Sequence, residues 1–375
     1  MKEVALYIHI PFCKQKCLYC DFASFANSEN LMNDYVEALI KEIKEKTKNI
    51  KVRSLFIGGG TPSYLEEKPL KILMDTIKGL NYIDGAEKTI ECNPGTLSKE
   101  KLQIIKDGGI NRLSFGLQTT KDSILKNIGR IHSFKEFEEN FILARKLGFN
   151  NINIDMMFGL PNQSVKDVKE SFEKIMKLNP EHISAYSLIV EEGTPFFNLY
   201  NKNLLVLPSE DEEREMYNVA KEYLVNNGYH QYEISNYSKE GKECFHNKVY
   251  WRCEEYVGVG IAATSFINNT REKNISSIRE YINRIHNNQC IIEESVVNNN
   301  NDNIEEYMFM NLRMMAGIIE SEFEKKFSTS IDSIYKEVIN KHIKNGLLKR
   351  EGGRIFLTEK GIELSNYVMS DMILE

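Results

Sequence analysis

Two kinds of segment alternate along the first half of the chain. Short, almost continuously apolar runs such as residues 4–10 have the pattern of strands buried on both faces. Longer segments between them repeat apolar residues every three or four positions, as in the amphipathic helix predicted for residues 31–48. The pattern predicts six strand–helix repeats, with strands at 4–10, 54–57, 88–91, 112–115, 151–155 and 182–186 and helices at 31–48, 67–79, 98–107, 133–147 and 164–177.

Regular alternation of strands and helices predicts an α/β fold with a parallel sheet and right-handed crossovers. Periodicity alone does not decide between a doubly wound sheet and a barrel. Both arrangements bind ligands at the carboxyl ends of their strands, so polar residues and glycines that follow the predicted strands are candidates for a site.

The second half of the chain has a different pattern. Ser209 precedes a predicted helix over about 210–227 in the manner of an N-cap. Residues 298–303 are a polar run that predicts a linker. Helices near 304–315, 320–327 and 331–345, then a hairpin turning at residues 352–353 and a helix capped by Thr358, have the order of a winged helix. We therefore predict divisions at 1–208, 209–297 and 304–375.

Composition limits the classes of protein to which the chain can belong. The formal net charge of −6 disfavours nucleic acid as the main partner. No apolar run is long enough to span a bilayer, and no signal-peptide pattern opens the sequence, so we expect a cytoplasmic protein without an integral membrane segment. Seven cysteines, three of them clustered, predict reduced thiols rather than a disulfide framework.

The clustered cysteines are Cys13, Cys17 and Cys20, in a CxxxCxxC array directly after the first predicted strand. Thiolates select iron–sulfur clusters, zinc or Cu(I). A structural zinc site is the simpler alternative, but such sites have four protein ligands, and no second pair of cysteines lies nearby. An iron–sulfur cluster held by three thiolates keeps one iron without a protein ligand, so the array predicts a reactive [4Fe–4S] cluster.

A second candidate motif runs from Cys244 to Trp251, with His246 and Tyr250 within it. A lone histidine beside large aromatic residues commonly packs in a core or forms a satisfied hydrogen bond. Histidine and tyrosine are also axial ligands of haem iron, and aromatic side chains suit a porphyrin face. Cys244 and Cys253 are further candidate iron ligands, although buried cysteines usually behave as small hydrophobic residues.

The cysteine array, with Tyr19 before its last cysteine, resembles the cluster loop of the radical S-adenosylmethionine (SAM) enzymes. In that family SAM chelates the open iron, and the reduced cluster cleaves SAM to release a 5′-deoxyadenosyl radical. The sequences Cys-Asp-Phe at 20–22, Gly-Gly-Gly-Thr-Pro at 58–62 and His-Asn-Lys-Val-Tyr-Trp at 246–251 resemble the HemW-type haem chaperones, relatives of oxygen-independent coproporphyrinogen dehydrogenase. This resemblance covers nearly the whole chain.

The resemblance implies an incomplete (β/α)6 radical-SAM barrel, open at its side, followed by an α+β extension and a C-terminal winged-helix-like domain. It also implies roles for individual residues, although glycines can simply form turns and polar residues at strand ends are often helix caps. The implied sets are Cys13, Cys17 and Cys20 for the cluster, Tyr7, Tyr19, Gly59, Gly60, Thr61, Glu91, Gln118, Arg130 and Asp155 for SAM, and His246, Tyr250 and Trp251 for haem.

The function that the resemblance implies is a haem chaperone that binds a [4Fe–4S] cluster, SAM and haem and passes haem to an acceptor protein. The alternatives are a coproporphyrinogen III dehydrogenase, which converts two propionates to vinyl groups, a haem-degrading radical enzyme, and an iron–sulfur-sensing regulator. The dehydrogenases carry a further cysteine at the position of Phe22, and only twelve residues precede Cys13 here. We therefore predict no dehydrogenase activity. The identity of the acceptor and the presence of a homodimer are left open.

Overall fold

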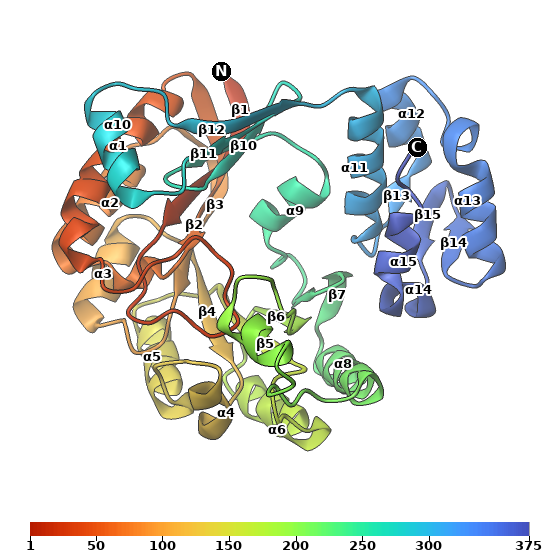
Figure 1. The fold of residues 1–375 in the computed structure, drawn as a ribbon, viewed down its shortest axis with the longest axis horizontal. Helices are drawn as coiled ribbons and strands as arrows, with labels where there is room; N and C mark the ends of the chain where they lie inside the picture. The colour runs from red at the N-terminus through yellow and green to blue at the C-terminus, as the bar shows by residue number, and fades with distance from the viewer. Residues whose placement is uncertain (375) are drawn as a thin grey trace.

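A curved sheet of parallel strands forms the centre of the protein, whose computed structural model describes residues 1–374 (Figure 1). Six parallel strands lie side by side in chain order, as the repeats predicted. They are β1 (Lys2–Ile10), β2 (Ile50–Gly59), β3 (Tyr82–Cys92), β4 (Arg112–Gln118), β5 (Ile152–Phe158) and β6 (His182–Ser187). Helices α1 (Met32–Lys46), α2 (Glu67–Lys78), α3 (Lys99–Asp107), α5 (Phe134–Lys146) and α6 (Val165–Met176) cover its outer face.

The curved sheet does not close into a complete barrel. On one side β1 pairs with β9 (Tyr256–Val259), and β10 (Thr264–Ile267), β11 (Thr270–Asn274) and β12 (Ile292–Val297) continue the sheet; on the other, β6 pairs with β8 (Asn236–Ser238), which pairs with β7 (His230–Glu233). The predicted incomplete barrel is confirmed, whereas these edge extensions were not predicted. The remaining segments of this part are η1 (Glu29–Leu31), η2 (Pro62–Tyr64), α4 (Asp122–Asn127), α7 (Pro195–Tyr200), α8 (Glu210–Asn226) and α10 (Ile278–His286).

The two faces of each parallel strand differ in polarity. In β4, Leu113, Phe115 and Leu117 are buried in the core beneath the outer helices, whereas Arg112 and Ser114 line a cavity on the concave face. Side chains alternate between the two faces of a strand, so this arrangement follows from the period of two. The concave face of the sheet therefore forms a polar lumen, and the packed core lies outside it.

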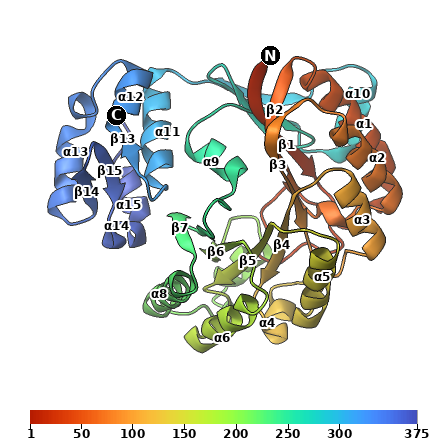
Figure 2. The same cartoon turned by 180° about the vertical axis from the view of Figure 1, so that it is seen from behind.

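Helix α9 (Phe245–Trp251) stands in the opening of the curved sheet, between the parallel strands and the C-terminal helices (Figures 1 and 2). No side chain of its own caps its amino end. Glu87 of β3 accepts hydrogen bonds from the backbone N–H groups of Phe245 and His246, each at 3.0 Å. A strand carboxylate thus fixes α9 in the opening.

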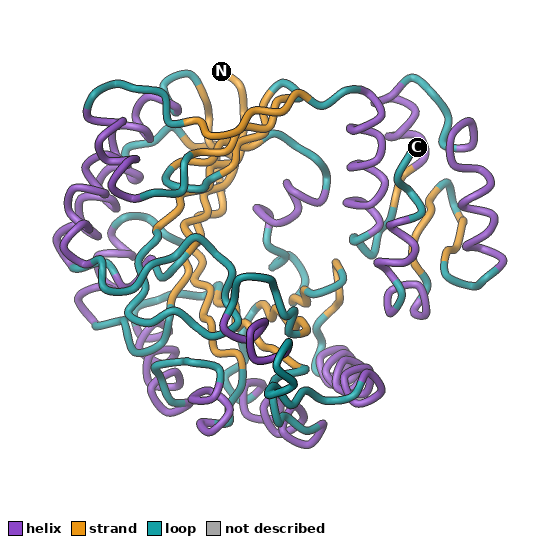
Figure 3. The backbone as a smooth tube through the Cα atoms, viewed as in Figure 1, coloured by secondary structure: helices purple, strands orange, loops and turns teal. Residues whose placement is uncertain are grey.

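The C-terminal part has its own hydrophobic cluster, from Ile304 to Met372. Its order of elements confirms the winged-helix-like prediction, and Figure 3 shows its helices around a small sheet. The elements are α11 (Asn300–Leu312), β13 (Ile318–Ile319), α12 (Glu320–Phe327), α13 (Asp332–Lys344), β14 (Leu348–Glu351), β15 (Arg354–Leu357), α14 (Glu359–Glu363) and α15 (Ser365–Ser370). The finer division of the chain at residue 208 stays a prediction.

The predicted linker at 298–303 is wrong for its last four residues, which form the first turn of α11. The side chain of Asn299 accepts hydrogen bonds from the N–H groups of Asn301 and Asp302, so it caps the helix and the polar run becomes helical. The predicted caps Ser209 and Thr358 are confirmed, since each accepts a hydrogen bond from a first-turn N–H group. Within residues 1–374, none of the helices could cross a lipid bilayer.

Candidate cluster and cofactor site

The three clustered cysteines lie on the loop that follows β1. The N–H of Cys13 donates to the carbonyl of Phe25 at 3.0 Å, and that of Cys20 donates to the carbonyl of Cys17 at 3.2 Å. Cys13 is buried, Cys17 and Cys20 are partly exposed, and all three are free thiols. The loop is therefore closed by backbone hydrogen bonds and presents its thiols without a disulfide.

Residues from the segments that follow β2 and β4 contact the cysteines. The hydroxyl of Thr61 lies 3.5 Å from the sulfur of Cys13, and a Cβ atom on Gly60 would lie 3.0 Å from that sulfur. Arg130 donates from Nη1 to the sulfur of Cys17 at 3.5 Å. Only glycine fits at position 60, and the guanidinium supplies positive charge where thiolates must form.

The donor set suits an iron–sulfur cluster. Within residues 1–374, no three His, Cys, Asp or Glu side chains converge as the ligands of one metal ion would. In a four-iron cluster each cysteine binds a different iron, so its ligands are more widely spaced. Burial raises the pKa of the Cys13 and Cys20 thiols, and metal binding would have to offset that cost by stabilising the thiolates. Three thiols on one loop beside a guanidinium fit this group.

A cavity of about 290 Å³ occupies the lumen. Four residues predicted to bind SAM line it from four different strands: Tyr7 of β1, Gly59 of β2, Glu91 of β3 and Asp155 of β5. Its other lining residues are His9, Phe22, Phe56, Arg112, Ser114, Asn153, Ser184 and Asn247. The structure thus brings together side chains that are far apart in the sequence.

Two carboxyl groups face this cavity. Glu91 accepts a hydrogen bond from the N–H of Gly59 at 3.1 Å, and Asp155 accepts one from Nδ2 of Asn153 at 2.6 Å. Burial, together with the nearby charge of Asp155, raises the pKa of Glu91 to about 8. Burial also raises the pKa of Asp155. At neutral pH Glu91 is largely protonated, and it can ionise when a cation enters the cavity.

The raised pKa of Glu91 predicts a pH-dependent effect on stability. Between the ordinary carboxyl value and about pH 8, Glu91 ionises in the unfolded chain but stays protonated in the folded protein. The folded state therefore loses stability as the pH rises through this range. Replacing Glu91 by Gln should remove that loss and stabilise the protein by about 1 kcal/mol or more at pH 8, but not at pH 5.

Urea unfolding of both proteins at pH 5 and pH 8 measures this effect. Glu222→Gln provides the control, because Glu222 is exposed on α8. Parallel pH profiles for wild type and Glu91→Gln would contradict the raised pKa.

The other residues predicted to bind SAM lie around the cysteine loop. Gln118, with a left-handed φ of 75°, is buried at the end of β4 and accepts a hydrogen bond from the hydroxyl of Tyr186 at 3.3 Å. Arg130 also donates to Oδ1 of Asn93 at 2.9 Å and to the carbonyl of Gly116. Tyr19 packs against Phe196 and does not line the lumen cavity. The predicted set therefore divides between the cavity and the cysteine loop.

Sequence reasoning missed most of the deeper lumen residues. Arg112, Ser114, Asn153 and Ser184 stand at alternate positions of three predicted strands, and all four line the cavity. Polar residues that recur every second position in otherwise apolar strands are a signal for a polar lumen. That pattern is present in the sequence of these three strands.

His246 of the predicted haem motif is buried, and both of its ring nitrogens have partners. Nδ1 lies 2.9 Å from Oγ of Ser54 in β2, and Nε2 lies 2.9 Å from the hydroxyl of Tyr250. Burial, with a smaller effect of the Arg112 charge, lowers the pKa of His246 to about 3. His246 is neutral at physiological pH, and it could bind iron only if one of these hydrogen bonds broke.

Trp251, at the end of the same helix, lines a separate groove of about 370 Å³ between α9 and the C-terminal part. The guanidinium of Arg313 lies 4.5 Å from the centre of its ring, and Nε1 of the indole is buried without a hydrogen-bond partner. Met310 and Met369 also line the groove. The groove thus combines an aromatic face, two thioethers and a cation.

A chain of hydrogen bonds connects the start of α9 with the lumen. The N–H of Cys244 donates to the hydroxyl of Tyr232 at 3.3 Å, which lies 2.8 Å from Nε2 of His182. Nδ1 of His182 lies 2.6 Å from Oδ1 of Asn153, whose amide in turn donates to Asp155. The haem motif and the predicted SAM-binding carboxylate therefore belong to one buried polar network.

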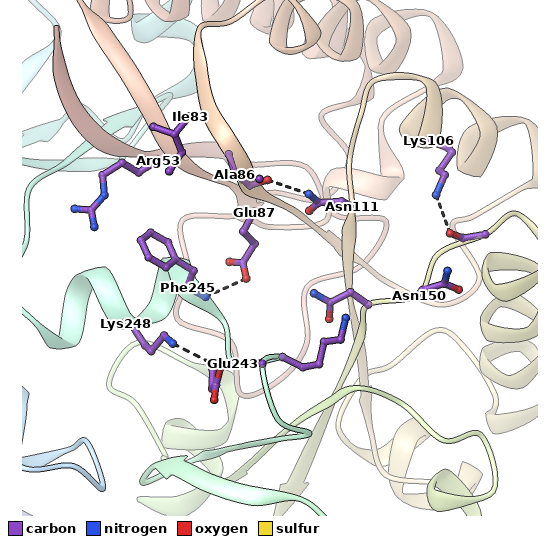
Figure 4. A pocket seen from close by; sticks show the side chains of 15 residues that line it. Arg53, Ile83, Ala86, Glu87, Lys106, Asn111, Asn150, Glu243, Phe245 and Lys248 are labelled. Carbon is purple, nitrogen blue, oxygen red and sulfur yellow. Dashed lines mark hydrogen bonds and ion pairs between the residues drawn. The ribbon is translucent and has the colours of Figure 1, made fainter.

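Another cavity, of about 660 Å³, lies at the opposite, amino-terminal end of the strands (Figure 4). Arg53, Glu87, Lys106, Phe245 and Lys248 contribute to its wall, and Glu87 points toward the start of α9. No His, Cys or Met side chain lines it, so it offers no usual protein ligand for haem iron.

Comparisons with known proteins agree with this geometry. The model of the radical SAM superfamily matches residues 7–175, and that of the HemN C-terminal domain matches residues 298–364. The haem chaperone HemW of Bacillus subtilis is 40% identical over 98% of this chain and 99% of its own length. The haem chaperone HemW of Lactococcus lactis is 38% identical over 100% of this chain and 98% of its own length.

Among solved structures, coproporphyrinogen III oxidase HemN from Escherichia coli, described as a radical SAM enzyme, has a similar fold. Its TM-score is 0.87 at 21% identity, and the match covers 99% of this chain and 90% of that chain. At this identity the similarity shows the fold alone. The sequence relatives, which are similar over their whole length, carry the assignment of the family.

Proposed function

The chain has a radical SAM domain and belongs to the HemW family of haem chaperones, and from this premise we propose that it binds haem and passes it to an acceptor protein. The observation that carries the proposal is the position of α9. Its two ends face different sites, because Asn247 lines the lumen cavity and Trp251 lines the groove beside the C-terminal part. Haem bound along this helix would lie between the two sites.

The cofactors proposed are a [4Fe–4S] cluster on Cys13, Cys17 and Cys20, and SAM on the residues at the rim and in the lumen. The radical SAM match and the free thiols beside Arg130 support the cluster. The carboxyl groups of Glu91 and Asp155 can accept hydrogen bonds from the amine and the ribose hydroxyls of SAM. Backbone carbonyls near Gly59 can also accept from the amine. When bound, the cluster and SAM would supply one-electron chemistry.

For haem, the favoured surface is the face of α9 that carries Asn247 and Trp251. Residues four positions apart lie on the same face of a helix, one above the other. In the groove, the aromatic side chain would pack on a porphyrin face, a thioether would bind the iron, and the cationic side chain would bind a propionate. His246 and Tyr250 stay proposed haem contacts, with the condition that their mutual hydrogen bond breaks if either binds iron.

The alternative function is conversion of coproporphyrinogen III, and we predict that it does not occur. Phe22 is exposed, lines the mouth of the lumen cavity and replaces the additional cysteine of the dehydrogenase pattern. Anaerobically reconstituted protein should therefore form no protoporphyrinogen IX from coproporphyrinogen III with SAM and reductant. Product chromatography over several equivalents of substrate measures this.

A control reaction with a known dehydrogenase must give product under the same conditions. Multiple turnovers by the present protein would contradict the chaperone proposal and favour the dehydrogenase. Titration with haem, followed through the emission of Trp251, tests the haem-binding part of the proposal.

A further inference from the structure

Arg112, at the start of β4, is 2% exposed. The carboxylates of Glu87 and Asp155 attract its charge, but neither forms an ion pair with it. Its guanidinium forms no ion pair within residues 1–374, and its Nε is buried without a hydrogen-bond acceptor. A buried charge without a partner costs free energy, so such a group is unusual in a folded protein unless a ligand pairs with it. Because Arg112 lines the lumen cavity, that ligand would have to enter the lumen.

The surroundings of Arg112 favour an anion. Of the carboxyl groups that line the cavity, Glu91 accepts from the N–H of Gly59 and Asp155 from the amide of Asn153. The charge of Arg112 acts on both groups, but neither forms a hydrogen bond or an ion pair with it. Ser114 accepts a hydrogen bond from Asn153 at 2.8 Å, so its own hydroxyl hydrogen is free to donate. The high pKa of Glu91, about 8, also limits the negative charge in the lumen at neutral pH.

The guanidinium of Arg112 and the hydroxyl of Ser114 are the kind of donors that bind a carboxylate. A guanidinium binds the two oxygens of a carboxylate through parallel hydrogen bonds, and a nearby hydroxyl can supply a third. The cavity of about 290 Å³ falls just below the range of about 300–1,000 Å³ typical of sites for whole drug-sized ligands. It suits an acidic side arm better than an entire tetrapyrrole.

Both SAM and haem carry carboxylates. The position of Arg112 indicates which of the two ligands it would bind. If the cluster occupies the cysteine loop, the carboxylate of SAM lies at the carboxyl end of the strands. Arg112 pairs with Thr89 of β3, whereas Glu91 pairs with Ser114, so Arg112 lies two positions deeper in the lumen than Glu91. Asn247 of the haem motif lines the same cavity, so the lumen reaches the proposed haem surface.

We infer that Arg112 binds a propionate of haem inside the barrel. This inference rests on the proposed haem-binding function. The macrocycle would lie outside, along the face of α9 that carries Asn247 and Trp251. Arg112 would then select tetrapyrroles with a free propionate. It would also place the bound haem in contact with the compartment that receives SAM.

The test compares haem with haem dimethyl ester, in which both propionates are blocked, on wild type, Arg112→Gln and Arg112→Lys. Dissociation constants come from the Soret band, and SAM affinity is measured separately on the cluster-containing protein. Wild type should bind haem about 10-fold to 100-fold more tightly than the ester, as expected for one charge-assisted pair. Arg112→Gln should bind haem and ester equally, with ester and SAM affinities unchanged.

Two further variants make the outcome specific. Arg53→Gln is a matched control, because Arg53 pairs with Glu254 at 2.6 Å and lines the other cavity, so haem preference should persist. Arg112→Lys keeps the positive charge but lacks the paired N–H donors of a guanidinium, so it should keep part of the preference for haem over the ester. Unchanged ester affinity in Arg112→Gln also shows that the variant is folded.

Several results would overturn the inference. Equal binding of haem and ester by wild type would remove the propionate contact, and equal weakening of both by Arg112→Gln would make the role structural. A loss of SAM affinity alone would assign the carboxylate to SAM. Failure of wild type to bind either porphyrin would instead overturn the proposed function, and the inference with it.

Discussion

Replacement of Cys17 by Ala is expected to remove almost all iron and acid-labile sulfide from the anaerobically reconstituted protein. Cys17 supplies one of only three thiols on the loop, and Arg130 donates directly to its sulfur. Two remaining thiolates would leave a second iron of a cubane without a protein ligand. The loop itself should persist, because it is closed through the carbonyl of Cys17 rather than through its side chain.

Iron and sulfide analysis, together with the electron paramagnetic resonance spectrum of the reduced protein, measures the effect. Cys290→Ala is the matched control, because Cys290 is exposed and lies outside the loop. Full cluster content in Cys17→Ala would contradict the assignment. Zinc in place of iron and sulfide, in wild type purified from anaerobic cells, would favour the structural zinc alternative.

Addition of haem should quench nearly all of the tryptophan fluorescence of the wild-type protein. The chain has one tryptophan, Trp251, so the whole signal comes from the proposed haem surface. Trp251 lines the groove with Met310 and Met369, and haem held there would accept energy from the indole. A saturable titration that follows Trp251 emission and the Soret band together gives stoichiometry and affinity. An absence of quenching in wild type would remove haem from this surface.

Substitution of His246 separates packing from iron coordination. His246→Ala removes the side-chain hydrogen bonds to Ser54 and Tyr250, so stability should fall by about 1–3 kcal/mol. A shifted Soret band and weaker haem binding would support His246 as an axial ligand. An unchanged Soret band with retained quenching would assign the ligand elsewhere, with Met310 and Met369 of the groove, then Tyr250, Cys244 and Cys253, as the next candidates.

The local elements of this fold could be predicted from the sequence. Apolar runs defined the six parallel strands, and the caps Ser209 and Thr358 were found where predicted. Strand pattern and capping depend on residues a few positions apart, so they are visible in a linear chain. The cysteine array was equally clear, because all three ligands come from one loop. The linker predicted for 298–303 was wrong for its last four residues, because an asparagine cap can start a helix within polar residues.

Other features depended on contacts that no local pattern contains. The sequence identified the motif of α9, but its position in the opening of the sheet depends on Glu87, Ser54 and the surface of α11. The hydrogen bonds that occupy His246 come from β2 and from its own helix, and one of them must break before His246 can bind iron.

The sequence by itself determined the six strand–helix repeats, the cysteine loop and the family resemblance. Only the tertiary structure placed Arg112 beside Ser114 and Asn247 in one cavity and left its guanidinium without an ion pair among residues 1–374. The physical reason is the curvature of the sheet, which turns alternate residues of separate strands toward a shared lumen. Whether a buried charge is paired depends on every element that surrounds it, and those elements meet only in the folded chain.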